Sequence, residues 1–159
     1  MGDVMEFVQI LTNTTIWIPA LAWLIAQIVK TAINAGINKK VSFSRLVGDG
    51  GMPSGHSATV TALAVMCGFE AGFDSVVFAF AVMFAIVVMK DALGVRRETG
   101  KQAESIISIA QLLNEAMTEK DDMIKTEKLK VLVGHTPLQV VCGAALGLFV
   151  AIVYQLLIM

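Results

Sequence analysis

The sequence contains two histidines, and each stands directly before an apolar segment. His56 lies in the glycine-rich stretch Gly50–Ala58, and His135 lies in Gly134–Pro137. Two histidines can divide a phosphoryl transfer, because one can attack phosphorus while the other protonates the leaving oxygen. A glycine-rich turn that enters a helix also offers backbone N–H groups and the positive end of the helix dipole, which suit an anion. The pattern therefore indicates phosphate chemistry.

Further charged residues could bind or orient the same anion. Arg96 and Arg97 carry planar guanidinium groups that match phosphate oxygens. Lys30 and Lys101 are further candidate phosphate ligands. Asp91 is a candidate orienting acid, because an acid at membrane depth is costly and tends to be functional.

Each of these features also has a simpler explanation. The turn before His56 can be only a helix cap, with Ser54 accepting a backbone N–H. Arginines at the inner end of a membrane span commonly serve as topological anchors. Asp91 can simply pair with Lys90 or an arginine. A functional site is favoured because all four predicted membrane helices bring polar groups to one level of the bundle.

The composition is that of an integral membrane protein. Of 159 residues, 56% are hydrophobic and 16% are charged, and the mean hydropathy is +0.74. Soluble domains are about a quarter charged, and a bilayer span takes about 20 apolar residues. We expect one membrane-embedded domain over residues 1–159. A net charge of −1 gives no basic bias toward nucleic acid, so no nucleic-acid partner is expected.

Apolar segments predict an all-α bundle of about four membrane helices. The predicted spans are residues 16–37, 57–73, 75–95 and 137–158. Pro19 is expected in the first turn of the first span, where a missing N–H does no harm. Val4–Leu11 is too short to span and is expected at the interface. Gly143 and Gly147 form a small-residue pair that allows close helix packing.

An amphipathic helix is predicted between the third and fourth spans. Its apolar positions recur at helical spacing: Ala103, Ile106, Ile107, Ala110, Leu113 and Met117. We expect this helix to pack on the bundle or to lie at the membrane surface. Glu119–Lys130 then reads as a charged, solvated linker. Cys67 and Cys142 lie inside apolar stretches, where packing is favoured over a disulfide.

Basic residues concentrate in two loops that share a side if four helices cross the membrane. The first loop holds Lys39, Lys40 and Arg45, and the third holds Arg96, Arg97, Lys101, Lys120, Lys125, Lys128 and Lys130. Positive charge near span ends favours the cytoplasm. We therefore expect both loops and the histidines at the cytoplasmic face and both termini outside. A bacterial inner membrane is the simplest location.

Three motifs resemble one known group of proteins. Pro53–His56 is similar to the central motif of the type 2 phosphatidic acid phosphatase superfamily, which includes lipid phosphatases and vanadium haloperoxidases. Together with Asp91–Glu104 and Gly134–Leu138, it resembles the small divergent branch called YuiD-like. This resemblance extends over nearly the whole chain.

The resemblance implies a role for each matching residue. His56 would be the general acid, and Ser54 and Gly55 would help to hold phosphate. His135 would be the nucleophile that forms a phosphohistidine. The superfamily works without a metal, so no cofactor is expected.

The sequence departs from the superfamily pattern at three places. No Arg-Pro pair follows Lys30 or Lys39, and Leu129 stands where an arginine is expected. Gln139 stands four residues after His135, where an acid is expected. Residues four apart share a helix face, so the amide oxygen of Gln139 could still orient His135.

Glutamine cannot supply the negative charge that favours imidazolium. We therefore expect a slow phosphatase, or one in which Asp91 replaces the missing charge.

The sequence thus predicts a membrane-embedded hydrolase of a lipid phosphate or diphosphate, prenyl phosphates included, working among membrane lipids. The alternatives are a lipid-phosphate binder or transporter that uses the same anion pocket, and a structural or partner-binding membrane protein. Four spans make a small bundle, so a homodimer that completes the site is a further expectation.

Overall fold

The computed structural model describes residues 2–38, 51–116 and 134–158. These residues form six helices: α1 (Gly2–Thr12), α2 (Thr14–Asn38), α3 (Gly55–Ala71), α4 (Val76–Leu93), α5 (Val95–Ala116) and α6 (Pro137–Ile158). The predicted all-α membrane bundle is confirmed, and the predicted spans match α2, α3, α4 and α6. Several basic residues of the two predicted cytoplasmic loops lie outside the described residues: Lys39, Lys40, Arg45, Lys120, Lys125, Lys128 and Lys130. Met117, Leu129 and the linker Glu119–Lys130 lie outside them as well.

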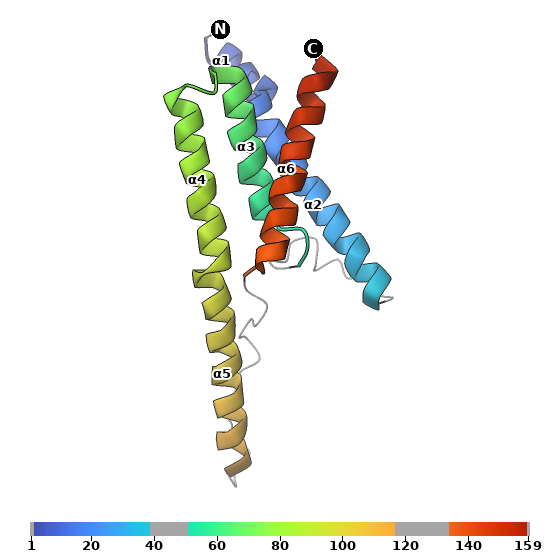
Figure 1. Ribbon diagram of the computed structural model, residues 1–159, viewed down its shortest axis with the longest axis vertical. Coiled ribbons are helices and arrows are strands. Elements are labelled where there is room, and N and C mark those ends of the chain that lie inside the picture. The colour runs from blue at the N-terminus through green and yellow to red at the C-terminus, as the bar shows by residue number, and fades with distance from the viewer. Residues whose placement is uncertain (1, 39–50, 117–133, 159) are drawn as a thin grey trace.

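Helix α3 lies at the centre of the bundle, with α2, α4 and α6 around it (Figure 1). The buried core joins small and apolar side chains of three helices: Ile18, Ala22, Ala26, Ala58, Ala62, Met66, Val150 and Ala151. Alanines dominate this cluster because small side chains let helix backbones approach closely, which is how membrane helices associate. The larger apolar side chains point outward, as Phe80 on α4 and Leu157 on α6 do.

Three stretches of the described chain are long and apolar enough to cross a membrane: Thr14–Gly36, Val76–Glu115 and Pro137–Ile158. Helix α3 has 17 residues, which is about 25 Å of helix and slightly less than a typical span. Helix α3 runs alongside α2, α4 and α6 (Figure 1), but it is not one of the three stretches that are long and apolar enough to cross a membrane.

The paired glycines of α6 allow this packing. A Cβ atom built on Gly143 would overlap the carbonyl oxygen of Ser54, and one built on Gly147 would overlap that of Ala58. The predicted packing role of both glycines is therefore confirmed. Cys67 and Cys142 are free thiols, as expected.

The start of α2 differs from our prediction. The side chain of Asn13 accepts a hydrogen bond from the backbone N–H of Thr15 at 3.0 Å, which caps the helix at an earlier residue than we expected. Pro19 therefore lies inside α2 rather than in its first turn.

The amphipathic helix is confirmed as α5, but it does not pack on the bundle, which was one of the two placements that we predicted. Helix α5 continues the direction of α4 and extends away from the bundle (Figure 1). The N–H of Gly94 bonds to the carbonyl of Lys90 at 2.9 Å, and the N–H of Glu98 bonds to the carbonyl of Gly94 at 3.0 Å. Because helical hydrogen bonds continue through Gly94, the chain does not turn back onto the bundle. Arg96 and Arg97 consequently lie in the first turn of α5 and not in a loop.

Candidate active site

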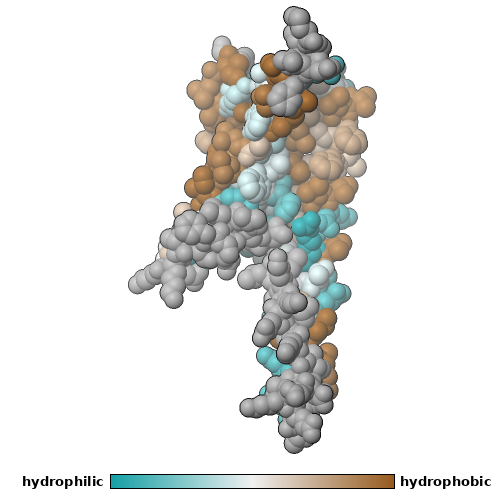
Figure 2. Space-filling view, turned by 180° about the vertical axis from the view of Figure 1, so that it is seen from behind, coloured by the Kyte–Doolittle hydropathy of each residue, from teal (hydrophilic) through white to brown (hydrophobic). Residues whose placement is uncertain are grey.

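The start of α3, the start of α6 and the junction of α4 with α5 meet at one end of the bundle. Helix α1 and the end of α6 lie at the opposite end (Figure 1). The N–H of Ser54 bonds to the carbonyl of Gln139 at 3.0 Å, and the N–H of His135 bonds to the carbonyl of Ala92 at 3.0 Å. These two backbone bonds fix the segments that carry the two histidines. Figure 2 shows polar side chains at the level where α4 passes into α5, below the apolar surface of the bundle.

The turn before His56 is a helix cap. The side-chain oxygen of Ser54 accepts hydrogen bonds from the N–H of Ser57 at 3.3 Å and from the hydroxyl of Ser57 at 3.0 Å. Both serines are fully buried. The cap that we considered for Ser54 is therefore present, and it holds His56 in the first turn of α3. A structural cap and a phosphate-binding turn are compatible, since the dipole of the capped helix still favours an anion there.

The two imidazole rings lie next to each other. Their centroids are 6.1 Å apart, and the ring planes meet at 63°. His135 is buried, with 4% of its surface exposed, whereas His56 is half-buried. The structure thus brings together two residues that are 79 positions apart in the sequence.

The side chain of Gln139 fixes the orientation of His135. Thr136 caps α6, and it exchanges hydrogen bonds with Gln139: the N–H of Thr136 donates to the amide oxygen at 3.1 Å, and the N–H of Gln139 donates to the threonine hydroxyl at 3.4 Å. This arrangement is a capping box. The same amide oxygen lies 3.2 Å from Nδ1 of His135.

These contacts determine the tautomer of His135. A backbone N–H can only donate, so the atom of Gln139 that faces Thr136 must be its oxygen. Because that oxygen also faces Nδ1 of His135, Nδ1 carries the proton. In the neutral ring the lone pair is then on Nε2. His135 is therefore held in the tautomer that a nucleophile would need.

The acid at position 91 has a partner other than His135. Its carboxylate accepts a hydrogen bond from Nε of Arg96 at 2.8 Å, and both side chains are about two-fifths exposed. The arginine pairing that we considered for Asp91 is thus present, while the contact to Nδ1 of His135 comes from Gln139.

The candidate cations lie at different places. Gly134 packs against the backbone of Arg96 and Arg97, so the start of α5 adjoins the residue before His135. Lys30 of α2 is buried, and its Cγ lies 3.3 Å from a Cβ built on Gly51. It therefore reaches the glycine-rich turn.

Lys101 is placed differently from the other cations. It is exposed on α5, where its ammonium pairs with Glu98 at 2.6 Å. It is three residues from that acid along the same helix, so its described ion pair is local to α5.

Comparison with known proteins agrees with the geometry. The sequence matches the divergent PAP2 family over residues 11–150. The chain belongs to this family. The uncharacterized membrane protein YuiD of Bacillus subtilis strain 168 is 37% identical over 151 residues, which cover 91% of this chain and 96% of that protein. No solved structure matches the chain.

Membership of the divergent PAP2 family confirms the resemblance that the three motifs indicated. The structure also explains one departure of this sequence from the superfamily pattern. Gln139 stands where the wider superfamily has an acid, and the structure shows that its oxygen still contacts His135. The orienting contact is therefore kept, whereas the negative charge is not.

Two residues near the site escaped the sequence analysis. Trp23 and Gln27 of α2 face Gly55: a Cβ built on Gly55 would lie 3.2 Å from Cδ1 of Trp23 and 3.9 Å from Nε2 of Gln27. For Gln27 the sequence did contain a signal, because a polar residue inside an apolar span tends to be functional. Gln27 also shares a helix face with Lys30, which follows three residues further along α2.

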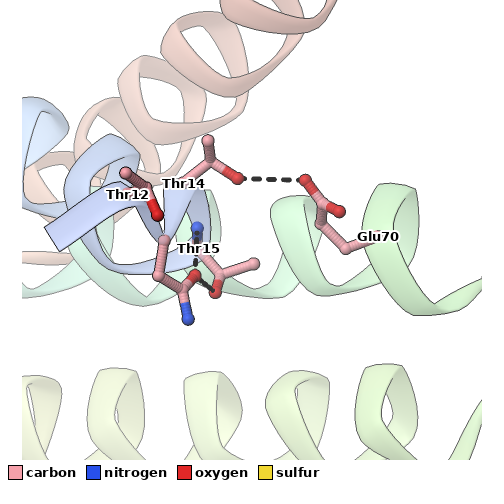
Figure 3. Close-up of a pocket in the computed structure, with 5 residues that line it drawn as sticks. Thr12, Thr14, Thr15 and Glu70 are labelled. Atoms are coloured by element: carbon pink, nitrogen blue, oxygen red, sulfur yellow. Dashed lines mark hydrogen bonds between the residues drawn. The ribbon is translucent and has the colours of Figure 1, made fainter. Parts of the chain in front are cut away.

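A separate open pocket lies at the other end of α3 and is lined by Thr12, Asn13, Thr14, Thr15 and Glu70. Its volume is about 370 Å³. The hydroxyl of Thr14 donates to the carboxylate of Glu70 at 3.0 Å, which links the start of α2 to the end of α3 (Figure 3). Since Glu70 and His56 are separated by about 21 Å of helix along α3, this pocket takes no part in the histidine site.

Proposed function

We propose that this membrane protein is a phosphatase that hydrolyses a lipid phosphate or diphosphate through a phosphohistidine intermediate. The observation that carries the proposal is the approach of two histidine rings to 6.1 Å, with Nδ1 of His135 held by Gln139 at 3.2 Å. Reacting atoms stand about 3 to 3.5 Å apart before attack, so Nε2 of His135 would stand at that distance from phosphorus while His56 contacts the leaving oxygen. Neighbouring rings at the start of α3 and the start of α6 allow both histidines to act on one phosphate group.

The proposed reaction has two steps. In the first, Nε2 of His135 attacks phosphorus, the bond from phosphorus to the lipid oxygen breaks, and His56 protonates that oxygen. In the second, water attacks the phosphohistidine, His56 takes a proton from the water, and inorganic phosphate leaves His135. Both histidines then return to their starting protonation states.

Cationic residues from the segments that adjoin the two histidines would hold the phosphate oxygens. Arg96 and Arg97 begin α5 beside Gly134, and Lys30 reaches the glycine-rich turn. With Ser54 and Gly55 at the start of α3, these residues form the proposed phosphate-binding set. Lys101 is its weakest member, because its described partner is Glu98 on α5.

A binder or transporter of lipid phosphates is the second candidate. It is favoured by the neutral amide of Gln139, which orients His135 without making it more basic. This alternative keeps the anion pocket and omits the chemical steps.

We further propose that the histidine end of the bundle faces the cytoplasm of a bacterial cell and that both termini face outward. The arginines at the start of α5 support this orientation, and the similar YuiD is a bacterial protein. A homodimer that completes the site remains a prediction.

The test compares two kinds of substrate in purified, detergent-solubilised protein. We expect His135→Ala to abolish phosphate release from both a lipid phosphate and p-nitrophenyl phosphate. We expect His56→Ala to abolish release from the lipid phosphate and to keep the first step with p-nitrophenyl phosphate, seen as a burst of nitrophenolate, because nitrophenolate is a good leaving group that needs no acid. Phosphate release that follows the burst should be slow, because His56 also activates the attacking water. Gln111→Ala, on the exposed face of α5, is the matched control. Anion binding without phosphate release in the wild type would favour the binder or transporter.

A further inference from the structure

The amide oxygen of Gln27 is a buried acceptor inside an apolar helix. Gln27 has 6% of its surface exposed. Among the residues that the structure describes, its Oε1 is the single buried side-chain polar atom without a hydrogen-bond partner. Burying such an atom without a partner costs about 1 to 3 kcal/mol, so its presence calls for a compensating role.

The nearest hydroxyl on the same helix does not satisfy this oxygen. The hydroxyl of Thr31, one turn further along α2, donates to the backbone carbonyl of Gln27 at 2.8 Å. That bond stabilises the main chain and leaves the side-chain amide of Gln27 unaffected. The hydrogen-bonding capacity of the amide oxygen is therefore available to another donor.

The amide of Gln27 adjoins the proposed phosphate-binding turn. Its Nε2 lies 3.9 Å from a Cβ built on Gly55, the first residue of α3 and the neighbour of His56. Lys30 follows on the same face of α2 and reaches Gly51 in the same turn. Glycine at position 55 is what lets α2 come so close, since a Cβ there would lie 3.2 Å from Trp23.

We propose that Gln27 is a substrate-positioning residue whose amide oxygen accepts a hydrogen bond from a hydroxyl group of the bound phosphate ester. This inference rests on the proposed function, because it requires an anion at the start of α3. An acceptor selects for a donor, and the substrate can supply one in two ways. A phosphate monoester carries an acidic P–OH group when singly ionised, and some lipid head groups carry an alcohol next to the phosphate.

Sulfate provides a clean comparison. Its shape resembles that of phosphate and its charge equals that of the hydrogen phosphate dianion, but it has no O–H group near neutral pH. Guanidinium and ammonium groups attract both anions, whereas an amide oxygen favours only the anion that donates. If Gln27 contacts the ligand, the site should therefore bind phosphate more tightly than sulfate. Arg96, Arg97 and Lys30 alone would bind the two anions about equally.

The experiment measures dissociation constants for four probes at pH 8, where inorganic phosphate is mostly the dianion and keeps one O–H: inorganic phosphate, sulfate, glycerol 3-phosphate and propyl phosphate. The wild-type protein in detergent is compared with Gln27→Leu and Gln27→Met, two variants of different shape that both lack the acceptor. Thr31→Val is the control, because it changes the adjacent turn of α2 and keeps the amide of Gln27.

If the phosphate itself donates, the wild type should bind phosphate about tenfold more tightly than sulfate, and both Gln27 variants should lose this preference. If an alcohol donates, glycerol 3-phosphate should bind about tenfold more tightly than propyl phosphate, with the same loss. Either outcome supports the proposal when Thr31→Val retains the preference.

Folded Gln27 variants that keep both wild-type ratios would overturn the proposal and leave the proposed function untouched. A wild type that binds none of the four anions would instead remove the anion site, and the proposed function would fail with it.

Discussion

Substituting glutamate for Gln139 adds one negative charge beside His135 and leaves the local fold in place. Glutamate and glutamine are equally suited to this position of a capping box, so Thr136 keeps its hydrogen bond. A negative charge in the first turn of a helix is itself favourable by about 0.3 to 1 kcal/mol. The melting temperature of Gln139→Glu should therefore equal or exceed that of the wild type.

The size of the effect follows from the contact between the amide oxygen of Gln139 and Nδ1 of His135, which is 3.2 Å long. Unit charges about 4 Å apart interact by about 4 kcal/mol at an effective dielectric constant of about 20. Only the part of this energy that appears in the transition state accelerates attack. One third of it, about 1.4 kcal/mol, makes the reaction about tenfold faster.

The assay is phosphate release under single-turnover conditions, measured across pH. We expect the maximum rate of Gln139→Glu to rise about tenfold. The acidic limb of the profile should move to higher pH, because a more basic ring must lose its proton before it attacks. Gln111→Glu places the same charge on the exposed face of α5 and should change neither property.

An unchanged or lower maximum rate, in a Gln139→Glu variant with an intact melting temperature, would contradict this prediction. It would mean that His135 does not act as the nucleophile, or that its basicity does not limit the rate. Binding of phosphate that persists in this variant would then favour the binder or transporter.

Three further predictions concern the support of the site. Gly143→Ala should lower the free energy of unfolding by about 1 to 3 kcal/mol, because its Cβ would overlap a carbonyl oxygen at the start of α3. Gly36→Ala should leave the free energy of unfolding unchanged, because no atom lies within 4 Å of a Cβ at that position. Thermal unfolding in detergent compares the two variants. Asp91→Asn should change the free energy of unfolding by less than about 1 kcal/mol, because the ion pair of Asp91 with Arg96 is two-fifths exposed. This variant should also keep phosphate release within about threefold of the wild-type rate. A complete loss of activity would show that Asp91 has a direct role. Gly134→Ala should reduce phosphate release at least about tenfold, because the glycine has a φ of +112° and packs against the backbone of α5; wild-type activity in that variant would contradict the packing argument.

The helices could be predicted from the sequence because apolar runs of membrane length have few alternatives in a bilayer. Helix α6 begins and ends at the predicted residues, Pro137 and Ile158. The placement of α5 could not be predicted, since amphipathic periodicity identifies a helix but not its direction. The hydrogen bonds through Gly94 determine that direction, and a glycine alone does not reveal whether a helix stops or continues.

The residues of the candidate site could be predicted from the sequence, but several of their contacts could not. His56 and His135 could be paired because both precede membrane helices whose ends share one side of the bundle. The partner of His135 had two candidates in the sequence, and only the structure shows that Gln139 makes the contact. Gln27 was missed because its spacing of three residues from Lys30 does not reveal which helix this face of α2 packs against, and only the structure places it beside Gly55.

In the proposed reaction the phosphoryl group passes through His135, so trapping the phosphohistidine is the decisive experiment. We expect lipid phosphate labelled with ³²P to leave acid-labile label on the wild-type protein, located at His135 by mass spectrometry. The label should be absent from His135→Ala. It should persist longer in His56→Ala treated with ³²P-labelled p-nitrophenyl phosphate, because His56 also activates the attacking water. Phosphate release at the wild-type rate by His135→Ala, with no label on the wild-type protein, would contradict the account.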